Sequence, residues 1–207
     1  MNFALVDDEL ALLWTVNMGC IDMNTWYSRV GKPERPDWVL FDLDPSPDVG
    51  IRETVQVALL VKRALDAFGL VGYPKTSSAE GMHVIVPIER RYTFEDTRRF
   101  AEIVAGAIAR THRGLATTEW SKQRRRGVLI DANQNGFGKT IASVYSVRPR
   151  PGAPVSTPLR WEEVTEDLDP RVFTMDVVLE RIGQHGDLFE GALTTKQRLN
   201  EALRALQ

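Results

Sequence analysis

Residues 38–45 read Trp-Val-Leu-Phe-Asp-Leu-Asp-Pro, so an apolar run ends in two aspartates one residue apart. A short run rich in valine, leucine and aromatic residues is typical of a buried strand, and the proline ends it. Strand side chains two residues apart share a face, so Asp42 and Asp44 are predicted to project together, about 7 Å apart along the backbone. The pattern therefore predicts an acidic pair at the end of a buried strand.

Two ionised carboxylates in such a position repel each other and lose part of their hydration. A divalent cation between them relieves both costs, and oxygen ligands suit Mg²⁺ or Mn²⁺. An isolated Asp-x-Asp more often belongs to a turn, but the buried strand directly before this one favours metal binding or catalysis.

Composition narrows the class of protein. The chain has 207 residues, of which 43% are hydrophobic and 26% charged, as in a globular protein of one or two domains. It contains no run long enough to span a bilayer and no signal-peptide pattern, so a cytoplasmic protein without a membrane partner is expected. The single cysteine, Cys20, excludes an internal disulfide framework, and its apolar neighbours predict core packing.

The formal net charge is −2, but the charges are unevenly distributed. Between residues 120 and 160 the only acid is Asp131, and the basic residues are Lys122, Arg124, Arg125, Arg126, Lys139, Arg148, Arg150 and Arg160. Between residues 162 and 190, nine acids accompany two arginines. A basic stretch in a nearly neutral protein indicates a local surface for a polyanion, although a solvated charged face has the same composition.

The rest of the chain alternates between helical and extended patterns. Helical spacing or capping residues predict helices at 5–19, 51–68, 94–110, 161–164, 172–183 and 194–206. Extended segments are expected at 38–44, 83–88, 116–119 and 127–131. Residues 149–160 form a proline-rich arm without periodicity. The alternation indicates an α/β or α+β fold, here a single domain over residues 1–207.

The loop from Ser77 to His83 precedes a predicted strand and reads Ser-Ser-Ala-Glu-Gly-Met-His. Small residues expose backbone N–H groups, which suit anionic oxygens, and His83 at the start of the strand can reach a ligand in the loop. The loop is therefore a candidate phosphate cradle. A simple turn beside a hydrogen-bonded core histidine explains it equally well.

Asp131 follows Val128-Leu129-Ile130, so a second carboxylate ends an apolar strand. With Asp42 and Asp44 it would complete a site of three carboxylates, as two-metal phosphoryl transfer requires. The alternative is an aspartate that opens the Asn-rich turn after it. Lys139, Arg148 and Arg150 near Tyr145 suit triphosphate recognition, because arginine offers paired donors to phosphate oxygens, and surface charge is again the alternative.

Taken together, these segments resemble the polymerase domain of bacterial DNA ligase D, a branch of the archaeo-eukaryotic primase superfamily that acts in end joining. The likeness covers nearly the whole chain. The matching stretches are Phe41-Asp42-Leu43-Asp44-Pro45, Thr76-Ser77 with Gly81-Met82-His83, Ile130-Asp131 with Asn133-Gln134-Asn135, and Gly138-Lys139-Thr140 with the long block from Tyr145 to Trp161. The last block is the most specific of the four.

The resemblance implies a primase-like core of mixed or antiparallel sheets flanked by helices. It also implies template-directed nucleotidyl transfer to a nucleic-acid 3′-OH, with two Mn²⁺ or Mg²⁺ ions as cofactors and an NTP or dNTP as substrate. The implied roles are metal binding and catalysis by Asp42, Asp44 and Asp131, and nucleotide binding by Ser77, His83, Lys139 and Arg148.

The partners that the resemblance suggests are primer-template or broken DNA, and ligase, nuclease or Ku-like proteins of non-homologous end joining. The setting would be the bacterial cytosol or nucleoid. Residues expected along the nucleic-acid backbone are Lys122, Arg124, Arg125 and Arg126.

The chain departs from the family pattern at three places. Asp42 comes too early for the N-terminal segment that usually precedes the Asp-x-Asp strand. Asn24 stands where the family has a histidine near the triphosphate, and asparagine carries no positive charge. Glu80 stands where the phosphate loop commonly has a lysine. These departures keep the three carboxylates and are expected to weaken triphosphate and DNA-end binding.

Two other functions are compatible with parts of the sequence. A catalytically weak or inactive nucleic-acid-binding module of a repair complex would account for Asn24 and Glu80. A haloacid-dehalogenase-like phosphatase would use Asp42 as nucleophile and Asp44 as acid, but it gives no role to residues 138–161.

Overall fold

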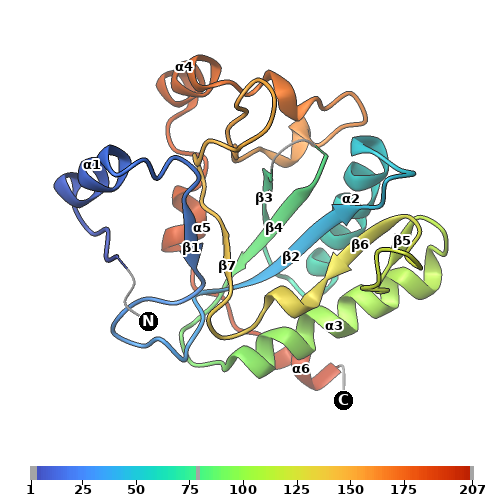
Figure 1. Cartoon of the computed structure of the whole chain (residues 1–207). Coiled ribbons are helices and arrows are strands. Elements are labelled where there is room, and N and C mark those ends of the chain that lie inside the picture. Colours follow the sequence, from blue (N-terminus) through green and yellow to red (C-terminus); the bar gives the residue numbers. More distant parts are fainter. Residues whose placement is uncertain (1–3, 78–79, 206–207) are drawn as a thin grey trace.

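A mixed β-sheet forms the centre of the molecule. The computed structural model describes residues 4–77 and 80–205, and within them this sheet has five strands in the order β3–β4–β2–β6–β5 (Figure 1). The strands are β2 (Trp38–Pro45), β3 (Tyr73–Thr76), β4 (Met82–Pro87), β5 (Ala116–Thr117) and β6 (Val128–Asp131). β5 and β6 run parallel, and the other neighbours are antiparallel. A mixed sheet with helices packed against it confirms the predicted α/β (α+β) class.

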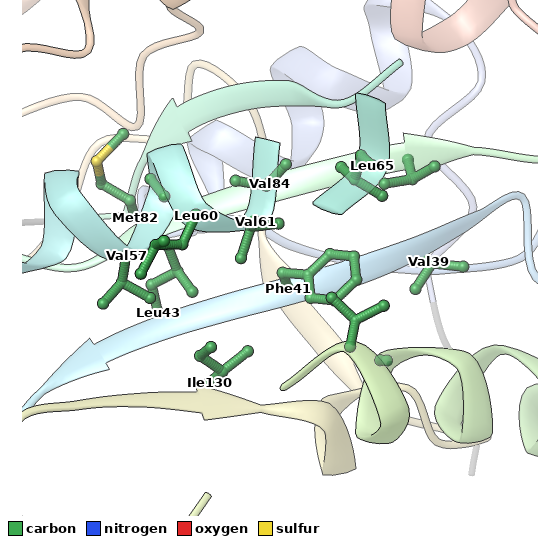
Figure 2. Packing of buried hydrophobic residues seen from close by; sticks show 14 of the residues in the cluster. Val39, Phe41, Leu43, Val57, Leu60, Val61, Leu65, Met82, Val84 and Ile130 are labelled. Carbon is green, nitrogen blue, oxygen red and sulfur yellow. The ribbon is translucent and has the colours of Figure 1, made fainter. Parts of the chain in front are cut away.

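Two long helices cover one face of this sheet. α2 (Ile51–Ala67) and α3 (Phe94–Thr111) pack there, and their apolar side chains join those of the strands in the main core. Figure 2 shows Phe41 of β2 close to Val61 of α2 within this cluster. Because side chains alternate along a strand, Asp42 next to Phe41 points to the opposite face.

The ends of these helices follow the local sequence. Thr93 Oγ1 accepts a hydrogen bond from Asp96 N at 3.1 Å, and the Asp96 carboxylate accepts one from Thr93 N at 2.8 Å. This reciprocal capping box starts α3 where the sequence predicts. Gly69, with a φ of 65°, follows α2 and ends it, as expected for a residue that tolerates the left-handed region.

A short ribbon covers part of the opposite face of the sheet. It consists of β1 (Asn24–Trp26) paired antiparallel with β7 (Thr140–Ala142), and α5 (Glu190–Thr194) lies nearby. Tyr27 and Ile141 from the ribbon region pack on Leu40 and Ile85 of the sheet in a second, smaller cluster. Figure 1 shows β1, β7 and α5 away from α2 and α3. Leu40 and Ile85 therefore mark the covered part of this face.

The remaining elements surround this core. They are α1 (Glu9–Asn17), α4 (Met175–His185), α6 (Asn200–Ala205) and the short 3₁₀ helices η1 (Ala132–Gln134), η2 (Trp161–Glu163) and η3 (Pro170–Val172). Within the described chain α1 has no buried residue, and Figure 1 shows it projecting from the body of the molecule. Across residues 4–77 and 80–205, no helix combines the length and apolar character that a membrane crossing requires.

Two predicted helices differ from the structure. The helix expected at 194–206 is wrong for its first half, because α5 ends at Thr194 and α6 starts only at Asn200. Between them the chain is extended: Gln197 pairs with Ile88, and its carbonyl accepts a hydrogen bond from Glu89 N at 2.9 Å. The helix expected at 5–19 is shorter, since the Asp8 carboxylate caps it by accepting from Ala11 N at 2.7 Å.

Three further segments differ from their predicted structure. Cys20 is exposed, so its predicted core packing is wrong. Residues 73–76, where the sequence predicts no strand, form β3. The second half of the proline-rich arm pairs with β3, because Thr76 N donates to Thr157 O and Leu159 N donates to Pro74 O, each at 2.9 Å. The arm therefore extends one edge of the sheet.

Asn135 completes the backbone hydrogen bonding of β2 where β6 ends. Its side-chain oxygen accepts from Leu40 N and its amide donates to Leu40 O, both at 2.8 Å. The amide also donates to Ala132 O at 3.1 Å, and Asn135 is 1% exposed. The side chain thus stands in for the strand residue that β6 no longer supplies, and it keeps buried backbone groups paired.

Asn135→Ala should destabilise the protein by roughly 2–4 kcal/mol, because it leaves the buried N–H and C=O of Leu40 without these partners. Chemical denaturation followed by circular dichroism measures the change. Asn133→Ala is the matched control, since Asn133 is exposed in the same turn, and it should change the free energy of unfolding by no more than about 0.5 kcal/mol. Equal effects from the two substitutions would contradict this role of Asn135.

Candidate active site

One row of polar side chains crosses four strands of the sheet. Asp131 of β6 lies opposite Asp42 of β2, Asp42 opposite His83 of β4, and His83 opposite Lys75 of β3. Residues directly opposite each other on antiparallel strands share a face. The row therefore runs from two carboxylates through a histidine to a lysine, on the face away from α2 and α3.

The acidic end of the row gathers the three predicted carboxylates. Burial, followed by the negative charge of Asp42, raises the pKa of Asp131, and the charge of Asp44 adds to the rise. Burial, with the charges of Asp42 and Asp131, also raises the pKa of the neighbouring Tyr27 hydroxyl. The three carboxylates are thus close enough to repel one another, which is the electrostatic condition that a bound cation relieves.

Arg125 contacts this acidic region from the basic turn. Its guanidinium donates to Asp44 Oδ2 at 2.8 Å, and its side chain is 6% exposed. This ion pair holds the Arg125 side chain inside the protein, and its predicted contact with a nucleic-acid backbone stays a prediction. Lys122, Arg124 and Arg126 of the same turn are exposed, and Arg124 pairs with Glu119 at 3.1 Å.

The donor chemistry of the acidic end suits a hard divalent cation. In the described residues, no three His, Cys, Asp or Glu side chains are already arranged as ligands around one point. Asp44 is paired with Arg125. Carboxylate oxygens are nevertheless the ligands that Mg²⁺ and Mn²⁺ prefer, and those of Asp42 and Asp131 face each other across the strand pair. The residues present therefore fit the implied metal.

His83 occupies the middle of the row and is 3% exposed. Its Nε2 lies 3.4 Å from Asp42 Oδ1. Burial, aided by the positive charge of Lys75, lowers the pKa of His83 to about 4, against the opposing effect of its hydrogen bond with Asp42. The imidazole is therefore neutral near pH 7. Within the described chain, the buried Nδ1 has no hydrogen-bond partner.

A cavity of about 220 Å³ opens beside the row. The predicted site residues that line it are Asp42, Asp44, Ser77, His83 and Arg148, and Asn24 borders it as well. Asp131 and Lys139 are not among the described residues that line it, although the positive charge of Lys139 acts on Asp131. A larger cavity of about 430 Å³, near Phe68 and Arg204, contains none of the predicted residues.

The Ser77 loop closes tightly at one side of this cavity. Ser77 N donates to Gly81 O at 3.0 Å. A Cβ atom at Gly81 would lie 2.7 Å from Ser77 Oγ and 3.1 Å from Leu43 O, so glycine is required there by close approach. Residues 78 and 79 of the predicted cradle lie outside the described residues. Glu80 is exposed.

Arg148 enters the site with a partner that sequence reasoning missed. Its guanidinium forms an ion pair with Asp22, which precedes β1, and Asn24 Nδ2 donates to the carbonyl of the same aspartate at 3.2 Å. Asp22, Asn24 and Arg148 thus meet at one side of the cavity. Residues 22 and 148 are far apart in the chain, and they are brought together by the β1–β7 pairing and by the hydrogen bonds of Met23 with Ser143 and Ser146.

The stability of the protein should fall as the pH drops from about 6.5 to about 4. The pKa of His83 is about 4 when folded and 6.5 in a model peptide, so the unfolded chain binds the proton first. The contribution of His83 to stability is fully present above about pH 6.5, and about 3 kcal/mol of it is lost as the pH falls to about 4. The difference in unfolding free energy between wild type and His83→Gln, followed across this pH range, measures the effect.

His112→Gln provides the control for this measurement, because His112 is exposed on the surface. It should leave the pH dependence of the wild type unchanged. If His83→Gln and wild type lose stability in parallel, the buried neutral imidazole is not responsible for the loss.

These features indicate the chemical class of ligand that the site suits. Oxygen donors beside fixed cations, around one cavity on a mixed sheet, suit a polyphosphate ligand that binds with a divalent metal. The family model described as "LigD, primase-polymerase domain" matches residues 1–189. The chain therefore belongs to the LigD primase-polymerase domain family, which confirms the resemblance found in its motifs. The haloacid-dehalogenase-like alternative has no support from this assignment.

Curated relatives carry the same family name. The bifunctional non-homologous end joining protein LigD of Bacillus subtilis is 35% identical over 182 residues, which are 87% of this chain and 30% of that protein. The multifunctional non-homologous end joining protein LigD of Pseudomonas aeruginosa is 31% identical over 197 residues, which are 94% of this chain and 24% of that protein. The chain thus spans less than a third of these relatives.

A solved structure supports the fold. The polymerase domain from Mycobacterium tuberculosis ligase D in complex with DNA matches with a TM-score of 0.81 and 28% identity, over 93% of this chain and 70% of that chain. The likeness confirms a primase-polymerase type of fold. The individual site residues stay predictions at this point.

Proposed function

We propose that this chain transfers nucleotides to the 3′-OH of a nucleic acid on a template, as part of joining broken DNA ends. The family assignment supports polymerase chemistry of this kind. The observation that carries the proposal is the row from Asp131 through Asp42 to His83, in which Asp42 and His83 line one cavity together with Arg148. Acids for metal ions and a cation for phosphates thereby stand side by side.

Asp42, Asp44 and Asp131 would hold two Mn²⁺ or Mg²⁺ ions. Such ions lower the pKa of an attacking hydroxyl and neutralise charge on a leaving phosphate. Asp44 becomes available for this role when its ion pair with Arg125 opens. The protein's own contribution is to hold three carboxylates on one face of a rigid sheet.

Ser77, His83, Arg148 and Lys139 bind and orient the triphosphate. Arg148 supplies positive charge and paired donors, and its ion pair with Asp22 holds it beside the cavity. His83 is neutral near pH 7, so it acts through a hydrogen bond and not through charge. In the reaction, the 3′ oxygen bonds to the α-phosphorus and the bond from that phosphorus to pyrophosphate breaks.

Asp42→Asn should lower Mn²⁺-dependent primer extension by roughly a hundredfold or more, because it removes one negative charge where cations are held. The assay uses a primer-template with NTPs and, separately, dNTPs. Asp48→Asn is the matched control, since Asp48 is an exposed aspartate in the turn after β2 and should retain activity. Full activity of folded Asp42→Asn would contradict the proposal.

A binding module without turnover is the second candidate. The observation that favours it is the Arg125–Asp44 ion pair, which holds one of the three carboxylates away from a ligand arrangement. Folded wild type that binds DNA but incorporates no nucleotide with Mn²⁺ or Mg²⁺ would establish this candidate and exclude the polymerase.

The exposed part of the basic turn should contribute to DNA affinity in a salt-dependent way. Lys122→Ala should reduce the slope of log affinity against log salt by about 1, the value expected for one phosphate contact. Fluorescence anisotropy with labelled duplex DNA at several salt concentrations measures the slope. Arg63→Ala, exposed on α2 against the other face of the sheet, should leave the slope unchanged. Identical slopes for both variants would remove the turn from the DNA interface.

A further inference from the structure

Lys75 ends the polar row and is almost completely enclosed, with an exposure of 1%. Lysines are rarely buried, because an ammonium group loses much of its hydration when it leaves water. Lys75 sits on β3 directly opposite His83, on the same face as Asp42. It is not among the described residues that line the cavity of the site.

The ammonium of Lys75 holds the chain segment that forms the edge of the sheet. Its Nζ donates to Ser156 Oγ at 2.5 Å, and Ser156 Oγ in turn donates to Thr76 O at 2.7 Å. Thr157 N adds a hydrogen bond to Thr76 Oγ1 at 2.9 Å. A buried network of this kind fixes position because an unpaired partner inside the protein is costly.

Ser156 belongs to the hairpin that carries Arg148. Tyr145 N donates to Ser156 O at 2.8 Å, Ser156 N donates to Ser146 O at 2.9 Å, and Arg148 N donates to Pro154 O at 2.8 Å. Tyr145 has a φ of 64°, a strained value for a residue other than glycine, so this hairpin is held against a local cost. The contacts of Lys75 therefore fix the strand from which Arg148 reaches the cavity.

We propose that Lys75 is a positioning residue for the triphosphate subsite, where it anchors the hairpin of residues 145–156 and adds a buried positive charge behind Arg148 and His83. The inference rests on the proposed function, because the subsite is defined by nucleotide binding. In this role Lys75 does not itself contact the substrate.

The charged groups around Lys75 make its protonation sensitive to nucleotide binding. The charged or titratable groups that face it are His83 on β4, Asp42 on β2 and Arg148 on the hairpin. Burial, followed by the charge of Arg148, lowers the pKa of Lys75 to about 7, against the opposing charge of Asp42. A polyphosphate beside Arg148 adds negative charge, which raises this pKa again. Nucleotide binding above about pH 7 therefore takes up a proton on Lys75.

The test is isothermal titration of ATP with Ca²⁺ into wild type, Lys75→Met and Ser156→Ala. Titrations run at about pH 7 and about pH 9, each in two buffers of different ionisation enthalpy, so that proton uptake is measured directly. Wild type should bind more weakly at the higher pH and take up protons. Lys75→Met should bind about tenfold more weakly at about pH 7, corresponding to one pKa unit, and should lose the proton uptake. Lys32→Met, an exposed lysine, is the control and should match wild type.

Ser156→Ala keeps the charge of Lys75 and removes its acceptor. It should weaken ATP binding but retain proton uptake, and it tests the anchoring role even if Lys75→Met fails to fold by circular dichroism. If Ser156→Ala binds ATP with wild-type affinity, the positioning role of Lys75 is overturned. The same holds if folded Lys75→Met keeps both wild-type affinity and unchanged proton uptake. Neither result affects the proposed function. Wild type that binds no ATP under these conditions overturns the proposed function, and this inference with it.

Discussion

Two carboxylates placed directly opposite each other on neighbouring strands, Asp42 and Asp131, are the constraint on which the rest of this site depends. Like charges in that relation destabilise a sheet, and burial followed by the charge of Asp42 raises the pKa of Asp131. The strands can carry this cost because their other face is packed against α2 and α3 by residues such as Phe41 and Ile130. A divalent cation between the two carboxylates would relieve this repulsion.

The cross-strand register extends this acidic pair into a row along which the side-chain charge changes from negative to positive. From Asp131 and Asp42 the row passes to neutral His83 and then to Lys75, with Arg148 beside the cavity. Negative charge thus stands at one end of the row, and positive charge at the other. A metal-bound triphosphate would have the complementary arrangement of charge, and strand register together with the hairpin that carries Arg148 prepares the surface on which it would lie.

The parts of the fold that depend on local pattern could be predicted from the sequence. β2, β4 and β6 are short apolar runs with clear ends, and α3 begins at a capping box between Thr93 and Asp96. The shared face of Asp42 and Asp44 follows from strand periodicity. The position of Asp131 beside this pair depends on the register between β2 and β6, which local sequence does not give. The family resemblance implied only that the three carboxylates act together.

Other features depend on contacts between distant segments and left no local signal. Lys75 lies in a strand of only four residues that includes a proline, so the local sequence does not indicate a strand. The strand forms because β4 and the proline-rich arm pair with it on either side. Asp22 meets Arg148 through the β1–β7 ribbon, and Arg125 is drawn from a basic turn to Asp44 by an ion pair. Cys20 lies in an apolar run, yet the described chain leaves it exposed. Hydrophobic pattern predicts a buried face only when another element covers it.

We propose that the three carboxylates jointly bind divalent cations beside a nucleotide. The most direct measurement is a crystal structure of the protein with Mn²⁺ and a non-hydrolysable nucleoside triphosphate, in which anomalous scattering locates the manganese. The account predicts manganese bound by Asp42, Asp44 and Asp131, with the triphosphate extending toward His83 and Arg148. A triphosphate bound elsewhere, or manganese absent from all three carboxylates while the nucleotide is in place, would contradict it.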